Sequence, residues 1–251
     1  MLSKKNILKS HAKINLALDI LGKDKNYHLV ETVICEVPDL YDEIEVKILR
    51  DGKSQIEIIT NNEELNANKE ENSVRAAVKL LAGNNSVKIT IKKNIPLRSG
   101  LGGGSSNAAT VLKELNDQLN LNLTTPQLRT LAAKISMDTP FFITGGVARA
   151  THYGEIIEPI RTDLILKPKI IFSTKSQKSS TGEMFAKIDN LPTGQNREKT
   201  KKLIRALENN DMQSVIKNLH NDFELLQVVS CKLPVTLHLS GSGPTCFKLL
   251  Q

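Results

Sequence analysis

The stretch Pro96–Ala109 reads PLRSGLGGGSSNAA and places four glycines and three serines directly before a helical pattern. Glycine lets the backbone approach a ligand closely and adopt positive φ, so successive N–H groups can form a concave, anion-binding cradle. A helix after the loop adds unpaired N–H groups and the positive end of its dipole. The hydroxyls of Ser105 and Ser106 can cap that helix or bind a phosphate oxygen. The stretch therefore predicts a phosphate-binding loop.

The residues around this loop decide between phosphate binding and the alternative, a flexible Gly/Ser linker. A linker needs neither a strand before it nor a helix after it. Here apolar and polar residues alternate upstream, and apolar residues recur at helical spacing downstream. The apolar residues are Val87, Ile89 and Ile91 before the loop and Ala108, Val111, Leu112, Leu115 and Leu119 after it. The strand–loop–helix order favours phosphate binding.

Length and composition indicate a globular protein. The chain has 251 residues, of which 39% are hydrophobic and 24% charged, so it can bury a sizeable core. It holds no apolar run of roughly 20 residues, and its start, MLSKKNILKS, lacks the apolar core of a signal peptide. We therefore expect a cytoplasmic protein without a membrane partner. Cys35, Cys231 and Cys246 are odd in number and far apart, and are expected to be ordinary thiols.

The net charge of +7 is compatible with nucleic acid, with small anions or with a lysine-rich surface. Aromatic residues make up only 4% of the chain, and the lysines are scattered. Because nucleic-acid surfaces combine basic stripes with aromatic stacking positions, we expect no nucleic-acid partner. The sequence gives no indication of an oligomeric state.

Strands and helices follow one another without a regular βαβ alternation, which favours an α+β fold. Period-two patterns predict strands, and helical spacing with caps predicts helices. The predicted strands of the first half are Ile7–Leu21, Val30–Val37, Ile44–Leu49 and Ile56–Ile59, and a loop is predicted at Asn61–Asn72. The predicted helices are one capped by Asn72 or Ser73 that runs through Leu81 and ends at Gly83, one after the glycine loop, and one from an N-cap at Thr125.

The pattern resets between Pro159 and Pro168. We therefore predict a boundary near residue 155, with one domain at 1–155 and a second at 156–251. The predicted elements of the second half are a strand at Ile170–Ser173, helices at Thr181–Ile188, Leu203–Glu208, Met212–His220 and Asp222–Val229, a loop at Asn190–Lys202, and two closing strands.

The glycine loop does not fit the two most familiar phosphate motifs. A Walker loop ends in lysine followed by Ser or Thr, and a dinucleotide loop reads GxGxxG with an acidic residue about twenty positions later. Neither pattern is present. The loop instead resembles the second motif of the galactokinase, homoserine kinase, mevalonate kinase and phosphomevalonate kinase (GHMP kinase) superfamily, P-x-x-x-G-L-G-x-S-S. Its triple glycine is most similar to the branch that phosphorylates 4-diphosphocytidyl-2-C-methyl-D-erythritol.

This resemblance implies two domains, a ribosomal-S5-like N-terminal domain that binds ATP and a ferredoxin-like C-terminal domain that binds the substrate. It implies ATP with Mg²⁺ as the phosphoryl donor, although no protein ligand for the metal is evident. The residues implied to hold ATP are Pro96, Leu97, Arg98, Ser99, Gly100, Leu101, Gly102, Gly103, Gly104, Ser105 and Ser106.

The segment AKINLAL places Lys13 and Asn15 on the same face of a predicted strand. By pattern alone, this is the solvated side of a sheet. The superfamily branch opens with a similar A-K-I-N-L segment, and its lysine lies beside the transferred phosphate. The resemblance therefore implies that Lys13 stabilises charge during phosphoryl transfer, with Asn15 contacting substrate.

Tyr27 and His28 follow Asn26 in a segment similar to the branch's D-G-Y-H, where the tyrosine stacks on cytosine and the histidine hydrogen-bonds the cytidine moiety. Asn26 replaces the glycine but also tolerates a left-handed backbone. Ser180–Phe185 is similar to the branch's S-T-x-x-x-F segment, which implies that Phe185 forms a second aromatic wall. The alternatives are turn packing for the Tyr–His pair and core packing for Phe185.

Asp138 lies in SMDTPFFITGG, between a predicted helix and an extended segment expected at Pro140. Alone, such an aspartate is a turn-former. The segment resembles the branch's G-x-D-V-P-F-F, which implies Asp138 as general base. Ser136 stands in place of the usual glycine, Thr139 in place of valine, and His152, further along, where glycine is common.

Leu239–Phe247, LSGSGPTCF, resembles the superfamily's third glycine-rich motif, and its alternative is an ordinary hairpin turn. The run Asn221–Glu224 has a family counterpart, N-D-x-E, and is interpreted as structural. His220 and Glu224 have i,i+4 spacing, but without a third ligand they do not indicate zinc.

The motifs span nearly the whole chain and together imply a kinase that transfers the γ-phosphate of ATP to the 2-hydroxyl of its cytidine diphosphate substrate. One alternative is a sister kinase for homoserine or mevalonate. Tyr27, His28 and Phe185 argue against it, because those substrates have no base to stack. The other is a catalytically silent nucleotide-binding regulator, which the presence of Lys13 and Asp138 disfavours.

Overall fold

The computed structural model describes residues 6–25, 27–49, 51–67, 72–172, 180–226 and 237–250. Its contacts form two compact units that interleave along the sequence. Unit 1 comprises the described residues of 1–12, 38–96 and 102–144, and unit 2 those of 13–37, 97–101 and 145–251. The long strands β1 (Leu8–Asp24) and β2 (Tyr27–Leu49) and the glycine loop each contribute to both units. The single domain boundary near residue 155 stays a prediction.

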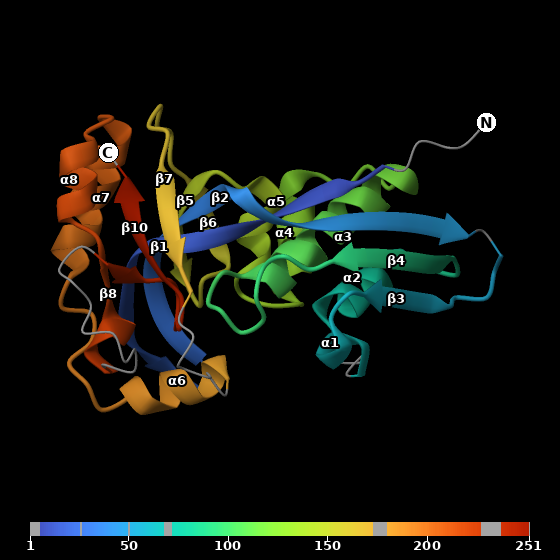
Figure 1. Cartoon of the computed structure of the whole chain (residues 1–251), viewed down its shortest axis with the longest axis horizontal. Helices are drawn as coiled ribbons and strands as arrows, with labels where there is room; N and C mark the ends of the chain where they lie inside the picture. Colours follow the sequence, from blue (N-terminus) through green and yellow to red (C-terminus); the bar gives the residue numbers. More distant parts are fainter. Residues whose placement is uncertain are drawn as a thin grey trace. The chain divides into compact units, whose positions relative to one another are not determined.

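Unit 1 combines a sheet with helices. The second half of β2 pairs antiparallel with β4 (Ser86–Lys92), and β4 pairs parallel with β3 (Ile56–Thr60), so the three strands lie side by side (Figure 1). The helices of this unit are α1 (Glu63–Ala67), α2 (Ser73–Leu81), α3 (Gly103–Gln118), α4 (Thr125–Ala133) and α5 (Thr139–Thr144). Helix α3 packs against α2, α4 and α5, which makes it the central helix of the unit.

Unit 2 contains strands from both ends of the chain. The first half of β2 pairs antiparallel with β5 (Val147–His152), and β5 pairs with β6 (Ile156–Pro159). Strand β1 pairs parallel with β8 (His220–Asn221). A second, antiparallel sheet has the order β7 (Lys167–Ile171), β10 (Cys246–Leu250) and β9 (His238–Leu239). The helices are α6 (Thr181–Ile188), α7 (Arg197–Glu208), α8 (Met212–Lys217) and the 3-10 helix η2 (Asp222–Leu226).

The α+β class and most predicted elements are confirmed, with several corrections. Two predicted strands form the single strand β2, because the segment between them stays extended. The predicted loop at Asn61–Asn72 contains α1, and α7 begins at Arg197 inside the loop predicted at Asn190–Lys202. Helix α8 ends at Lys217, and His220 lies in a strand. Ser173, Val229 and Cys231 lie outside the described residues.

Local capping explains where two helices begin. Asn72 Oδ1 accepts a hydrogen bond of 3.0 Å from the backbone N–H of Val74 at the start of α2. Helix α4 is capped by Thr124 rather than by the predicted Thr125, because Gln127 closes a capping box with Thr124. The prediction was therefore off by one residue. In the part of the chain that the structure describes, no helix is long and apolar enough to cross a membrane.

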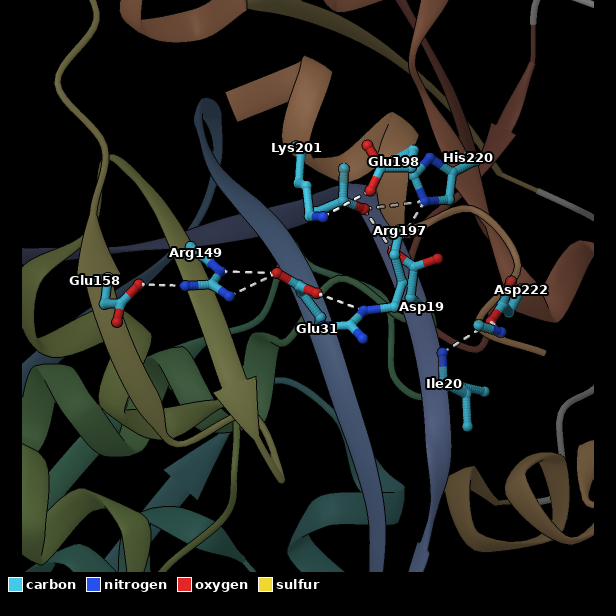
Figure 2. Close-up of polar contacts among 12 residues, drawn as sticks. Asp19, Ile20, Glu31, Arg149, Glu158, Arg197, Glu198, Lys201, His220 and Asp222 are labelled. Atoms are coloured by element: carbon cyan, nitrogen blue, oxygen red, sulfur yellow. Dashed lines mark hydrogen bonds and ion pairs between the residues drawn. The ribbon is translucent and has the colours of Figure 1, made fainter. Parts of the chain in front are cut away.

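A buried polar cluster in unit 2 attaches the end of β1 to later segments (Figure 2). Asp19 Oδ2 accepts a hydrogen bond of 2.5 Å from the Thr200 hydroxyl of α7 and lies 3.2 Å from His220 Nε2 of β8. Asp222 Oδ2 accepts backbone hydrogen bonds from Ile20, at 2.8 Å, and from Gly194, at 2.7 Å. The four side chains of Asp19, Thr200, His220 and Asp222 are buried. The cluster thus fixes α7 and β8 against the first strand.

The difference in stability between Asp222→Asn and the wild type is expected to vary with pH. Asp222→Ala, in contrast, should be less stable than wild type at every pH. Burial is the main cause that raises the pKa of Asp222 above its usual value of 3.8. A raised pKa in the folded state means that wild-type stability falls as the pH rises through the window above 3.8. Asn keeps an acceptor oxygen without the charge, so it should gain stability relative to wild type across that window.

Ala leaves two backbone N–H groups without their acceptor and should cost about 1–3 kcal/mol. Urea unfolding of the three proteins from acid to neutral pH measures both effects. A constant difference between wild type and Asp222→Asn at all pH values would contradict the role assigned to burial.

Candidate active site

Lys13 and Asn15 lie buried on one face of β1, with 3% of each residue exposed. Lys13 Nζ donates a hydrogen bond of 2.6 Å to Asn15 Oδ1, and Asn15 Nδ2 donates one of 2.9 Å to Thr32 Oγ1 of β2. Thr32 in turn donates to the backbone oxygen of Ala17. The solvated-face alternative for these residues is therefore excluded. Lys13, Asn15 and Thr32 thus form one hydrogen-bonded chain of buried polar side chains between β1 and β2.

The first part of the glycine loop, Leu97–Leu101, contacts the same strand. The backbone N–H of Lys13 donates a hydrogen bond of 3.0 Å to the carbonyl of Leu101. Gly100 has φ +81°, and a Cβ there would lie 2.2 Å from the backbone oxygen of Ser240. Only glycine permits both the backbone conformation and the close approach. The loop is thus fixed beside the lysine by its backbone.

The third glycine-rich motif, Leu239–Phe247, contacts both the glycine loop and Lys13. It is the turn between β9 and β10, so the hairpin alternative describes its backbone correctly. It also contacts the loop, because Ser240 Oγ donates a hydrogen bond of 3.0 Å to the carbonyl of Gly100. A Cβ on Gly241 would lie 3.1 Å from that carbonyl oxygen and 3.2 Å from Lys13 Nζ. In unit 2, Lys13, Leu97–Leu101 and Ser240–Gly243 therefore come together.

The run Asn221–Glu224 secures the same turn, in agreement with its structural interpretation. Asn221 Nδ2 donates hydrogen bonds to the carbonyls of Leu239, at 2.9 Å, and of Gly241, at 2.8 Å. Glu224 Oε1 accepts from the backbone N–H of Leu239 at 2.9 Å. His220 and Glu224 thus have separate partners, and among the described residues no three His, Cys, Asp or Glu side chains group as a metal site.

The second part of the loop, Gly102–Ser106, leads into α3 in unit 1. Gly102 is the N-cap residue with φ +71°, and among the described residues no side chain forms a cap hydrogen bond to this helix. Ser106 Oγ is already occupied, because it lies 2.7 Å from Ser10 Oγ of β1. The first N–H groups of a sixteen-residue helix can therefore serve an anion.

Asp138 is half-buried in the turn between α4 and α5. The residues on either side of it form a chain of hydroxyls: Ser136 Oγ lies 2.8 Å from Ser105 Oγ and 2.7 Å from Thr139 Oγ1. The two departures from the family pattern therefore connect the first turn of α3 to the Asp138 turn. The extended segment expected at Pro140 is wrong, because Pro140 lies in the first turn of α5, where its fixed φ suits a helix.

The aromatic residues of the expected base site are arranged in two pairs. His28 stacks on Phe185 of α6, with ring centroids 4.6 Å apart and planes 25° apart. Tyr27 is half exposed, and its ring centroid lies 5.1 Å from that of Tyr153. His28 thus covers one face of Phe185, and the Tyr27–Phe185 sandwich stays a prediction. Asn26 lies outside the described residues.

His152 is the last residue of β5 and has a left-handed backbone conformation, with φ +65°. Such a backbone costs roughly 1–2 kcal/mol for a residue with a Cβ, which explains why glycine suits this position. The His152 Nδ1 atom lies 2.5 Å from Glu155 Oε1, so a side-chain contact accompanies the unfavourable backbone.

Sequence reasoning missed Asp42 and Lys93, which hold the segment directly before the glycine loop. Asp42 is fully buried and accepts hydrogen bonds from the backbone N–H groups of Asn94, at 2.7 Å, and Ile95, at 2.8 Å. It also forms an ion pair with Lys93, whose Nζ would lie 3.2 Å from a Cβ on Gly103. A lysine thus lies beside the start of α3, although none follows the glycines. No local pattern marks Asp42, because its partners lie about fifty residues away.

Arg149 and Arg197 both contact Glu31 of β2 (Figure 2). Arg149 donates to Glu31 Oε1 at 2.7 Å and to Glu158 at 2.8 Å, and Arg197 donates to Glu31 Oε2 at 3.3 Å. Glu31 is itself buried, so paired guanidinium groups offset the cost of its charge. This network ties β5 and α7 to β2 in unit 2.

The chain is similar to proteins of known families. The pattern of the GHMP kinases N terminal domain matches residues 72–146, which include the glycine loop and Asp138. A protein named 4-diphosphocytidyl-2-C-methyl-D-erythritol kinase from Alkaliphilus metalliredigens (strain QYMF) is 36% identical over 97% of this chain and 87% of its own length. One of the same name from Clostridium perfringens (strain SM101 / Type A) is 35% identical over 96% of this chain and 87% of its own.

Solved structures agree on the fold. A crystal structure of 4-(cytidine 5′-diphospho)-2C-methyl-D-erythritol kinase has a TM-score of 0.69 and 24% identity, covering 98% of this chain and 90% of that one. A mevalonate kinase from L. major in complex with R-mevalonate has a TM-score of 0.71 and 16% identity, covering 99% and 89%. Because both match similarly well, the fold alone does not separate these activities.

Proposed function

The chain belongs to the 4-diphosphocytidyl-2-C-methyl-D-erythritol kinase family, and from this premise we propose that it transfers the γ-phosphate of ATP to the 2-hydroxyl of 4-diphosphocytidyl-2-C-methyl-D-erythritol. The products would be ADP and the 2-phosphate. One observation carries the proposal: a buried lysine, Lys13, lies where Gly241 leaves room for its ammonium beside the glycine loop. A cationic side chain against a backbone anion cradle is the arrangement that phosphoryl transfer requires.

In this proposal the loop holds the phosphates of ATP. The αL backbone of Gly100 and Gly102 and the uncapped start of α3 fit a polyphosphate, because they offer N–H groups and a dipole rather than side-chain volume. The ammonium of Lys93 lies beside Gly103 as an additional N–H donor, with its charge balanced by Asp42. Mg²⁺ bound with the nucleotide would offset phosphate charge, held by phosphate oxygens and water as much as by protein.

Lys13 and Asp138 have different tasks. Asp138 accepts the proton of the substrate's 2-hydroxyl as its oxygen bonds to the γ-phosphorus, while the bond from that phosphorus to the bridging oxygen of ADP breaks. Lys13 stabilises the negative charge that develops in this step. Asn15, through its hydrogen bond to the ammonium, orients Lys13 and lies where substrate contact is expected.

Tyr27, His28 and Phe185 are proposed to bind the cytidine moiety. The half-exposed ring of Tyr27 offers a stacking face, and His28 offers an imidazole edge. These residues distinguish the proposed substrate from homoserine and mevalonate, which carry no base. Since the substrates are polar metabolites, a cytoplasmic location is part of the same proposal.

A direct assay separates the proposal from its two alternatives. Purified protein is incubated with Mg²⁺, ATP and one of three alcohols, the cytidine diphosphate substrate, mevalonate or homoserine, and ADP release is coupled to a spectroscopic readout. We expect ADP and a singly phosphorylated product only with the first alcohol. Turnover with mevalonate or homoserine instead would establish the sister activity, and ATP binding without turnover on any alcohol would establish the regulator.

A further inference from the structure

Helix α6 holds the imidazole of His28 by two side chains that are one turn apart. Phe185 covers one face of the ring, with the centroids 4.6 Å apart. Asp189, the C-cap residue of the same helix, contacts the ring edge through Oδ1 and His28 Nε2. Residues at i and i+4 lie on the same side of a helix. One helix thus fixes both the plane of the imidazole and its rotation within that plane.

Phe185 and Asp189 are themselves held in place by further side chains. Phe185 packs edge-on against the buried ring of Phe223, with centroids 4.9 Å apart. The second carboxylate oxygen of Asp189 accepts a hydrogen bond of 2.9 Å from Lys23 Nζ of β1. Hydrogen bonds from Lys23 and then His28 hold the pKa of Asp189 below its usual value. Asp189 is therefore a carboxylate at neutral pH.

An ionised carboxylate only accepts hydrogen bonds. The nitrogen that faces it, Nε2 of His28, must therefore carry the hydrogen, because two acceptors cannot pair. In the neutral imidazole the other nitrogen, Nδ1, then presents a lone pair, since the partner of one ring nitrogen sets the state of the other. Asp189 thus decides what kind of hydrogen bond His28 can offer to a ligand.

We propose that Asp189 is a positioning residue that fixes His28 as a hydrogen-bond acceptor and so makes the site select a cytosine base over a uracil base. The inference rests on the proposed function, in which His28 binds the cytidine moiety. Cytosine carries an amine at C4 that donates to a lone pair, whereas the carbonyl at C4 of uracil offers only another acceptor. A site whose acceptor is left unpaired rejects the wrong base.

The first test measures binding and needs no turnover. Calorimetry compares cytidine 5′-diphosphate with uridine 5′-diphosphate on wild type and on Asp189→Ala, Asp189→Asn and Asp189→Glu. Wild type should prefer the cytidine ligand by roughly tenfold or more, as one good hydrogen bond implies. Asp189→Ala should lose most of that preference, and Asp189→Asn should lose it too, because its amide can donate to Nε2 and free Nδ1 to carry the hydrogen. Asp189→Glu, which keeps the carboxylate, should restore part of it.

The second test separates positioning from mere folding. With the cytidine diphosphate substrate, Asp189→Ala should raise KM for that substrate roughly tenfold, change kcat little, and leave KM for ATP and the melting temperature close to wild type. Asp163→Asn is the matched control, because Asp163 is an exposed carboxylate outside the proposed base site and accepts a hydrogen bond from Asn210 Nδ2. It should change none of these values.

The outcomes for the inference and for the proposed function are distinguishable. Equal affinities of wild type for the two diphosphates, or an unchanged preference in Asp189→Ala, would overturn the role of Asp189. So would parallel losses in melting temperature, kcat and both KM values. If wild type prefers the cytidine diphosphate through Asp189 but turns over none of the three alcohols, the inference stands and the proposed activity fails.

Discussion

Asp138→Asn is expected to lower kcat by roughly 100- to 10,000-fold, the usual contribution of a general base. The amide keeps the shape of the side chain but cannot take the proton of the 2-hydroxyl. Because Asp138 lies in a turn flanked by the hydrogen-bonded Ser136 and Thr139, the backbone there should stay in place. KM for ATP should therefore change little, and calorimetry should detect nucleotide binding at close to wild-type affinity.

The control for this substitution is Asp117→Asn, an exposed carboxylate on α3 in the same unit. It should leave kcat unchanged. Lys13→Met should also lower kcat by roughly 100- to 1,000-fold, through lost stabilisation of developing charge. The double variant should lose much less than the product of the two factors, because residues that act in one step are not additive. Unchanged turnover in Asp138→Asn would remove Asp138 from the base role.

Gly100→Ala is expected to cause a large loss of stability, although it adds only one methyl group. The new Cβ would lie 2.2 Å from the backbone oxygen of Ser240, and a φ of +81° is unfavourable for alanine. A shift of either backbone segment would also disturb the hydrogen bond from Ser240 Oγ to the Gly100 carbonyl. We expect a loss of roughly 3–5 kcal/mol in the free energy of unfolding, or a displaced loop with a large rise in KM for ATP.

Gly52→Ala separates the two causes. Gly52 has φ +70°, and a Cβ there would meet nothing within 4 Å. That variant should cost only about 1 kcal/mol, from the backbone conformation alone. Urea unfolding and ATP kinetics of both variants make the comparison. If the Gly100 and Gly52 variants behave alike, the contact between the glycine loop and the third motif does not hold the site together.

Local patterns were sufficient to predict those parts of the fold that depend on neighbouring residues. The helix that begins after Asn72, the helix after the glycine loop and the strand before it follow from caps and periodicity. The break predicted between the strands at Val30–Val37 and Ile44–Leu49 is absent: β2 runs without interruption from Tyr27 to Leu49, pairing with β5 in its first half and with β4 in its second half. Strand pairing is a long-range property that a local pattern does not contain.

The same distinction applies to the candidate site. Lys13, Asp138 and the glycine loop were predicted from motifs and stay predictions as site residues, although the burial of Lys13 argues against the surface alternative. Asp42 and Asp189 were not identified, because each acts on a partner far along the chain: Asp42 on Asn94, and Asp189 on His28, 161 positions away. A single aspartate without a pattern carries no local signal of its partner.

The cluster around Asp19 has a consequence for how the protein is made. Asp19 meets His220 across 201 positions of sequence, and β1 pairs with β8 at the same place. During synthesis β1 therefore leaves the ribosome long before β8 has been made. Until then, Asp19 stays exposed to solvent without His220 as its partner. Unit 2 can therefore complete its folding only after β8 has been made. A fragment that ends near residue 155 should not form the buried cluster around Asp19.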